Sequence, residues 1–175
     1  RRAMLVMLVA VLVSPVFADL SFSFGSRLAA LVVQDTPFPP AVQLLSGLGA
    51  GMRAGGPQLT ADLSLDVAYA PDTLPVEGSV YRGIVLRTIG LGASWTPVAG
   101  LGIRASGVLA LAGYRATRLL FFFPGVELAP MLTHRLGRWT RLEWSLPVSY
   151  HFRRDMRIAA AVGIQARVTA RLEHP

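Results

Sequence analysis

Apolar and polar side chains alternate along most of this chain with a period of two residues. The clearest stretch lies near the C-terminal end, where every second residue from Ile158 to Leu172 is apolar and the residues between are Ala, Gly, Gln, Arg or Thr. Successive side chains of a β-strand point to opposite faces, whereas a helix would mix the two sets. The pattern therefore predicts a strand with one apolar face.

Seven further segments carry the same alternation, two of them clearly and five more loosely. The eight segments cover residues 20–32, 42–52, 58–69, 85–96, 101–111, 120–133, 141–153 and 157–172. Proline, glycine or aspartate residues separate them, at 35–40, 55–57, 71–78, 97–100, 113–118, 137–138 and 154–155, and such residues favour turns. The sequence predicts eight antiparallel strands joined in order. Pro147 lies inside the seventh segment, where its missing N–H is unfavourable, and we expect it to mark a β-bulge.

The composition of the second face distinguishes two kinds of barrel. In a soluble barrel of the lipocalin type that face meets water, whereas in a membrane barrel it fills the interior. It is rich in Gly, Ala, Ser and Thr, and charged residues are only 15% of the chain, against about 25% in typical domains. We therefore predict an all-β fold, an eight-stranded antiparallel up-and-down transmembrane β-barrel. A soluble lipocalin-like binding barrel is the less favoured alternative.

The first 18 residues have the pattern of a secretory signal peptide. An Arg-Arg pair precedes a short apolar run that a Ser-Pro pair ends, and Val16 and Ala18 stand at the −3 and −1 positions of a signal-peptidase site. We expect 1–18 to be a signal peptide cleaved after Ala18, and 19–175 to form the barrel. A buried N-terminal helix or an uncleaved anchor is the alternative. No apolar run reaches the roughly 20 residues of a membrane helix.

In its eight strands and its apolar outer face the chain resembles the small outer-membrane β-barrels of the OmpA, OmpX and OmpW type. The resemblance covers the predicted mature chain as an architecture. It implies the bacterial outer membrane as location, with outer-membrane lipids and the barrel-assembly machinery as partners. The chain departs from those barrels at its last five residues, Arg-Leu-Glu-His-Pro, where they commonly end in an aromatic residue.

The inward face carries charges that need partners. All 17 basic residues are arginines, and their planar guanidinium groups pair well with carboxylates. Buried charges need such pairing, so we expect an interior network of Asp62, Asp66, Glu127 and Glu143 with Arg27, Arg104, Arg141 and Arg167. The same assignment also turns Arg53 and Arg171 inward. The network either fills the interior or, as the resemblance to OmpA-type barrels implies, opens a narrow gated path. The first is favoured because eight strands leave little room.

The residues give little support for catalysis, metal binding or nucleic-acid binding. The chain has no cysteine, which excludes thiolate nucleophiles and zinc-thiolate sites, and His134 and His174 are isolated, so we expect no metal and no cofactor. The arginines are scattered, which argues against nucleic-acid binding despite a net charge of +7. Glu143, Ser149 and His151 share one strand face and resemble the residue types of the lipid A deacylases, but in a different order. The predicted function is a structural or passive-transport barrel for small solutes or apolar molecules. The alternative is a surface-interaction or lipid-modifying barrel, and the oligomeric state stays open.

Overall fold

A computed structural model describes residues 20–34, 41–56, 58–69, 84–114, 120–152 and 158–172. The predicted signal peptide and the longest predicted connection, 71–78, lie outside these residues. The described chain forms nine β-strands: β1 (Leu20–Gln34), β2 (Ala41–Gly55), β3 (Leu59–Tyr69), β4 (Ile84–Val98), β5 (Leu101–Tyr114), β6 (Leu120–Arg135), β7 (Thr140–Ser145), β8 (Val148–His151) and β9 (Ile158–Leu172).

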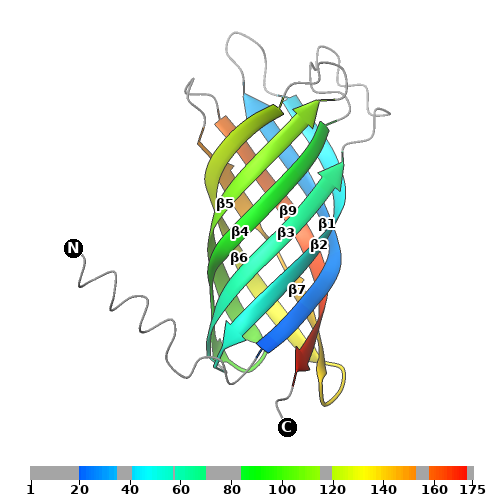
Figure 1. The fold of residues 1–175 in the computed structure, drawn as a ribbon, viewed down its shortest axis with the longest axis vertical. Helices are drawn as coiled ribbons and strands as arrows, with labels where there is room; N and C mark the ends of the chain where they lie inside the picture. The colour runs from blue at the N-terminus through cyan, green and yellow to red at the C-terminus, as the bar shows by residue number, and fades with distance from the viewer. Residues whose placement is uncertain are drawn as a thin grey trace, which may run out of the picture.

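The strands close into one antiparallel barrel (Figure 1). From β1 to β7 each strand pairs with the next along the chain, β7 and β8 both pair with β9, and β1 pairs with β9 to complete the ring. The short strands β7 and β8 both lie between β6 and β9, so they are two halves of one barrel strand. The predicted eight-stranded antiparallel up-and-down barrel is confirmed.

Pro147 interrupts that strand without inserting a residue. The partners on β6 and β9 follow the same register on both sides of it. The Leu146 N–H still donates to the Pro130 carbonyl at 3.1 Å, and the Gly163 N–H donates to the Pro147 carbonyl at 2.9 Å. The expected β-bulge at Pro147 is therefore wrong, because the only loss is the proline's missing donor. A shift of register occurs instead on β4, between Trp95 and Val98.

The register also fixes the stagger of the barrel. Partners followed once around the ring from Phe22 return to β1 ten residues further on, at Val32, by way of Met52, Leu63, Leu91, Gly107, Val126, Tyr150 and Ala160. Such a stagger requires strands tilted by roughly 35–45° to the barrel axis, and eight strands then enclose a space that side chains can fill.

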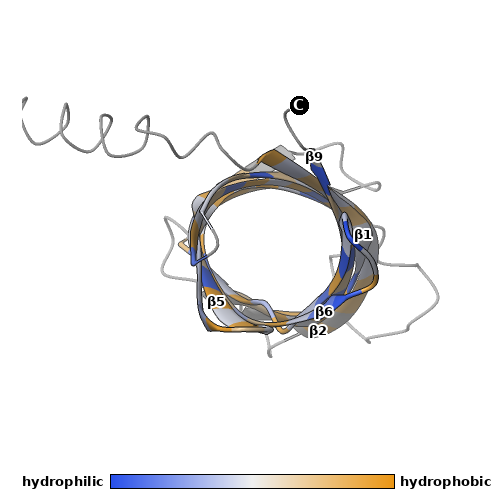
Figure 2. Cartoon of the chain, turned by 90° about the horizontal axis from the view of Figure 1, so that it is seen from below, coloured by the Kyte–Doolittle hydropathy of each residue, from blue (hydrophilic) through white to orange (hydrophobic). Residues whose placement is uncertain are grey.

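Large apolar side chains cover the outside of the barrel, and mostly small or polar ones line the inside. Viewed along the axis, the strands form a closed ring (Figure 2). The outward set includes Phe24, Leu48, Leu65, Ile89, Leu91, Phe122, Leu128 and Ile164, each more than half exposed. A contiguous apolar surface of this extent is not tolerated in water and indicates contact with lipid. Arg87, a basic side chain that the alternation puts on the apolar face, is exposed there.

The two ends of the barrel differ in their connections. At the end that holds the start of β1 and the end of β9, the connections span residues 56–58, 99–100 and 136–139. At the opposite end they span 35–40, 70–83, 115–119 and 152–157. Short turns face the periplasm in barrels of the outer-membrane type, so we call the first end the periplasmic end.

No helix among the described residues is long and apolar enough to cross a membrane.

Candidate functional site

The barrel lumen contains three successive regions. Nearest the outer end is an apolar plug, formed by Ala29, Leu31, Leu45, Ala68 and Ala161 with Leu86 packed against them. Next is a layer of paired charges, which we call the ion-pair layer. At the periplasmic end the lumen widens into a cavity, the vestibule, with a volume of about 630 Å³.

Arg53 on β2 holds the periplasmic side of the ion-pair layer. Its Nη2 donates to Oε1 of Glu143 at 2.9 Å, and its Nη1 contacts the other oxygen of the same carboxylate. Its Nε lies in ion-pair contact with Asp62, to which the Ser94 hydroxyl also donates. One guanidinium fork thus joins two carboxylates from opposite sides of the barrel, a geometry that a lysine could not provide.

Arg104 occupies the middle of the layer. Its guanidinium lies 3.6 Å from a carboxylate oxygen of Glu127 and 3.6 Å from one of Glu143. Its Nη2 also donates to Oε1 of Gln165 at 3.1 Å. Arg27 binds the other side of Glu127 at 3.0 Å. The chain of contacts therefore runs continuously from one wall of the lumen to the other.

Asp66 completes the layer on the β3 side. Arg167 Nη2 donates to both of its carboxylate oxygens, at 2.9 and 3.2 Å, and Gln165 Nε2 donates to one of them at 3.1 Å. A Cβ at Gly49 would lie 1.9 Å from Asp66 Oδ1. Glycine at this position therefore makes the space in which the carboxylate meets Arg167.

The ion-pair layer is balanced in charge. Four arginines (Arg27, Arg53, Arg104 and Arg167) face four carboxylates (Asp62, Asp66, Glu127 and Glu143). All eight side chains are at most 15% exposed. Removing one member of such a buried set leaves a charge without a partner, which costs about 3–5 kcal/mol.

The structure brings seven of the eight predicted network residues into this layer, and the eighth lies elsewhere. Arg141 faces inward but is exposed at the vestibule rim, and it forms no ion pair with any described residue. It lies outside the network because all four carboxylates lie deeper in the lumen. Arg53, which the alternation turns inward but which was not assigned to the network, binds Glu143 and Asp62 in place of Arg141.

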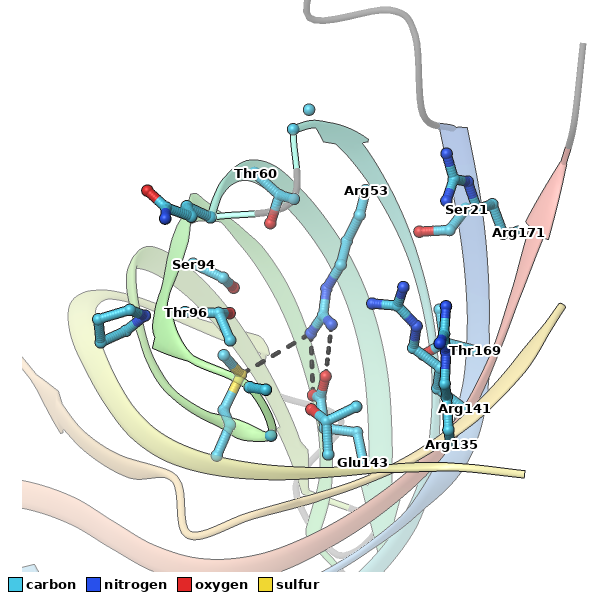
Figure 3. A pocket seen from close by; sticks show the side chains of 18 of the residues that line it. Ser21, Arg53, Thr60, Ser94, Thr96, Arg135, Arg141, Glu143, Thr169 and Arg171 are labelled. Carbon is cyan, nitrogen blue, oxygen red and sulfur yellow. Dashed lines mark hydrogen bonds and ion pairs between the residues drawn. The ribbon is translucent and has the colours of Figure 1, made fainter. Parts of the chain in front are cut away.

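The vestibule is basic. Arg135, Arg141 and Arg171 come from the adjacent strands β6, β7 and β9 and line the wall opposite Thr60 and Thr96 (Figure 3). Arg135 and Arg141 are directly opposite each other in the β6–β7 register. Among the described residues that line the cavity, Glu143 is the sole carboxylate, and Arg53 binds it at the floor.

Two features of the lumen were missed by the sequence reasoning. Leu31 and Leu45 of the apolar plug follow or precede lipid-facing residues in continuous apolar stretches, so the alternation does not single them out. Arg135 has the same strand parity as Glu127 and Thr133 and could have been found by extending the sixth segment to its observed end.

Ser149 and His151 lie together, and Glu127 lines the same small cavity, but no described carboxylate forms a hydrogen bond with either side chain. The Ser149 hydroxyl is 3.3 Å from Nε2 of His151, and both side chains are buried beside a cavity of about 20 Å³. Glu143 instead binds Arg53 and contacts Arg104. The Ser, His and Glu arrangement considered for lipid hydrolysis is not assembled, and this cavity is far too small for an acyl chain.

The described residues contain no group of three or more His, Cys, Asp or Glu side chains that could hold a metal ion. His134 is exposed at the periplasmic end of β6.

Comparison with solved structures identifies the fold. The structure is similar to Neisserial surface protein A (NspA), with a TM-score of 0.59, 12% identity, and coverage of 86% of this chain and 97% of that one. It is also similar to Ail, the attachment invasion locus protein of Yersinia pestis, with a TM-score of 0.50, 10% identity, and coverage of 87% and 98%. No family model and no curated protein sequence matches the chain. Its fold is that of these small outer-membrane β-barrels, and its apolar outer face is the kind of surface that such barrels present to lipid.

Proposed function

We propose that the protein serves the outer membrane as a sealed structural barrel, with no open path for water-soluble molecules in its resting state. The observation that carries the proposal is the double closure of the lumen. The ion-pair layer spans it from Arg27 to Asp62, and the apolar plug lies beyond. A solute would have to break both to cross.

Passive transport is the alternative that this geometry disfavours. Between the ion-pair layer and the plug, the cavity beside Ser149 and His151 measures about 20 Å³, enough for about one water molecule. Passage of a small polar solute requires the buried charges to separate, at several kcal/mol for each broken pair. Passage of an apolar molecule requires the same charges to face it without compensation.

The outer face supports lipids as the standing partners. Its exposed side chains are large and apolar on every strand of the ring, as expected for a surface solvated by acyl chains. We also propose that the barrel-assembly machinery inserts the protein. An unpaired strand edge is costly in the hydrocarbon core, so all strand edges of the barrel must be paired as it enters the membrane.

A liposome-swelling assay tests the proposal. Vesicles containing the refolded protein are diluted into iso-osmotic arabinose, and their swelling is followed by light scattering beside empty vesicles and vesicles with a general porin. We expect the protein and the empty vesicles to behave alike. Swelling at a rate approaching that of the porin vesicles, in proportion to the amount of protein, would contradict a sealed barrel.

A further inference from the structure

The vestibule has the features of a binding site that closing the lumen does not require. The ion-pair layer already satisfies its own charges, four against four. The rim adds two more arginines on neighbouring strands, Arg135 and Arg141, and no further carboxylate among the described lining residues accompanies them. Like charges placed directly opposite on adjacent strands are destabilising, so Arg135 and Arg141 repel each other at the rim.

A buried hydroxyl below the rim gives a second, independent indication. Thr169 on β9 lines the vestibule and is only 8% exposed. Its Oγ1 is buried and has no hydrogen-bond partner among the described residues. In the register, Thr169 is the partner of Arg141 on β7, and Figure 3 shows it beside Arg141 and Arg135 on one wall of the cavity. A buried polar atom without a partner carries a penalty, and rotation of the Thr169 side chain about χ1 would present the hydroxyl to a ligand that removes it.

The geometry points to a site for a phosphate-bearing molecule in the vestibule, with Arg135 and Arg141 as its principal cationic ligands. Guanidinium forks approach from two adjacent strands, and the Thr169 hydroxyl lies deeper on the same wall. A phosphate offers several acceptor oxygens and up to two charges to such a set, whereas a carboxylate offers two coplanar oxygens.

The size and position of the cavity narrow the ligand further. A volume of about 630 Å³ lies in the range of pockets that hold drug-sized molecules. The floor is closed by the Arg53–Glu143 pair, so the ligand enters and leaves from the periplasmic side. The phosphate belongs either to a soluble phosphorylated metabolite or to the headgroup of an inner-leaflet phospholipid that reaches over the rim.

Binding is tested with inorganic pyrophosphate as the probe. The full-length barrel is refolded in a maltoside detergent, which contains no phosphate, and titrated by isothermal calorimetry at low salt. We expect saturable binding of one pyrophosphate per barrel, stronger than binding of succinate and weakened by added sodium chloride. An absence of saturable binding, or equal binding of succinate, would overturn the assignment.

Variants locate the site. The double variant R135Q/R141Q should weaken pyrophosphate binding at least about tenfold, since it removes two charge-assisted donors. T169V should weaken it by about two- to fivefold, and T169S should retain it. The matched control is R138Q, which removes one positive charge from the exposed turn at the same end, where Arg138 stacks over Trp139 but does not line the cavity. A loss in R138Q as large as in the double variant would mean general attraction by the rim, and would overturn the site.

A competition experiment distinguishes a lipid headgroup from a soluble phosphorylated molecule as the source of the phosphate. Micelles are doped with short-chain phosphatidic acid or, as a control, with an uncharged diacylglycerol of the same chain length, and the pyrophosphate titration is repeated. Competition by phosphatidic acid alone assigns the site to a lipid headgroup. Unchanged pyrophosphate affinity in both assigns it to a soluble phosphorylated molecule. Either conclusion holds only if the wild-type barrel binds pyrophosphate and R135Q/R141Q loses that binding.

Discussion

The ion-pair layer and the vestibule rim use the same cation in opposite ways. In the layer each arginine faces a carboxylate, and the side chains are almost completely removed from solvent. At the rim Arg135 and Arg141 face each other and solvent, without a carboxylate partner among the described residues. The difference shows that depth along the axis, and the carboxylates found at that depth, decide whether an inward arginine stabilises the barrel or is available to a ligand.

The largest expected effect is the loss of stability when a carboxylate of the ion-pair layer is removed. E143A leaves Arg53 and Arg104 without a shared carboxylate, and we expect a loss of about 3–5 kcal/mol in the free energy of unfolding. Urea titration in micelles, with the heat-dependent shift on gels as readout, measures it. The matched rim variant R141A should change stability by no more than about 0.5 kcal/mol. Equal losses in E143A and R141A would show that the two regions do not differ.

A second prediction compares two neighbouring leucines on β2. Leu45 is 1% exposed in the apolar plug, whereas Leu44 faces lipid at 47% exposure. L45A should cost about 2–5 kcal/mol because it leaves a cavity that the rigid barrel cannot close. L44A should cost clearly less, since lipid can fill the space. The same urea titration applies, and a larger loss in L44A would mean that the apolar plug is not a packed core.

A third prediction concerns the space around Asp66. In G49A the new methyl group meets the carboxylate and displaces it from Arg167, so we expect a loss of about 1–3 kcal/mol. The control is G107A, because a Cβ at Gly107 meets nothing closer than 3.8 Å on the outer face. If both variants unfold at the same urea concentration, Asp66 does not need the close packing observed at Gly49.

The smallest expected effect is a change of stability with salt, caused by the two opposed arginines at the rim. Adding salt screens the repulsion between the exposed Arg135 and Arg141, so wild-type stability should rise slightly between low and moderate ionic strength, by less than about 1 kcal/mol. The rise should be smaller in R141A, which no longer has the opposed pair. A salt response unchanged by R141A would show that the two arginines do not interact.

The alternation of side chains was sufficient to predict the fold, because a period of two assigns every residue of a strand to one face. It assigned Asp62, Glu127 and Glu143 to the inward face, and all three side chains are buried. The alternation does not specify height along the axis. That height follows from the ten-residue stagger of the closed ring, which depends on pairings between distant strands. For this reason the sequence placed Arg141 in the network although it lies at the rim.

The apolar plug was hidden for a different reason. Leu44 and Leu45 are adjacent and equally apolar, yet one faces lipid and the other the lumen. In a membrane barrel both faces can be apolar, so hydrophobicity alone cannot tell a plug from a lipid-facing position. Pro147 shows a different limit of sequence reasoning. A proline removes a backbone donor and disrupts local pairing, yet the strand register is the same on both sides of Pro147.

Single-channel recording in planar lipid bilayers tests the sealed lumen most directly. The refolded protein is added at increasing amounts, with a general porin as positive control in the same membranes. The paired charges and the apolar plug predict a current no different from that of the bare bilayer over the whole range. Regular conductance steps from the wild-type barrel, at a frequency that rises with the amount of protein, would contradict a sealed lumen.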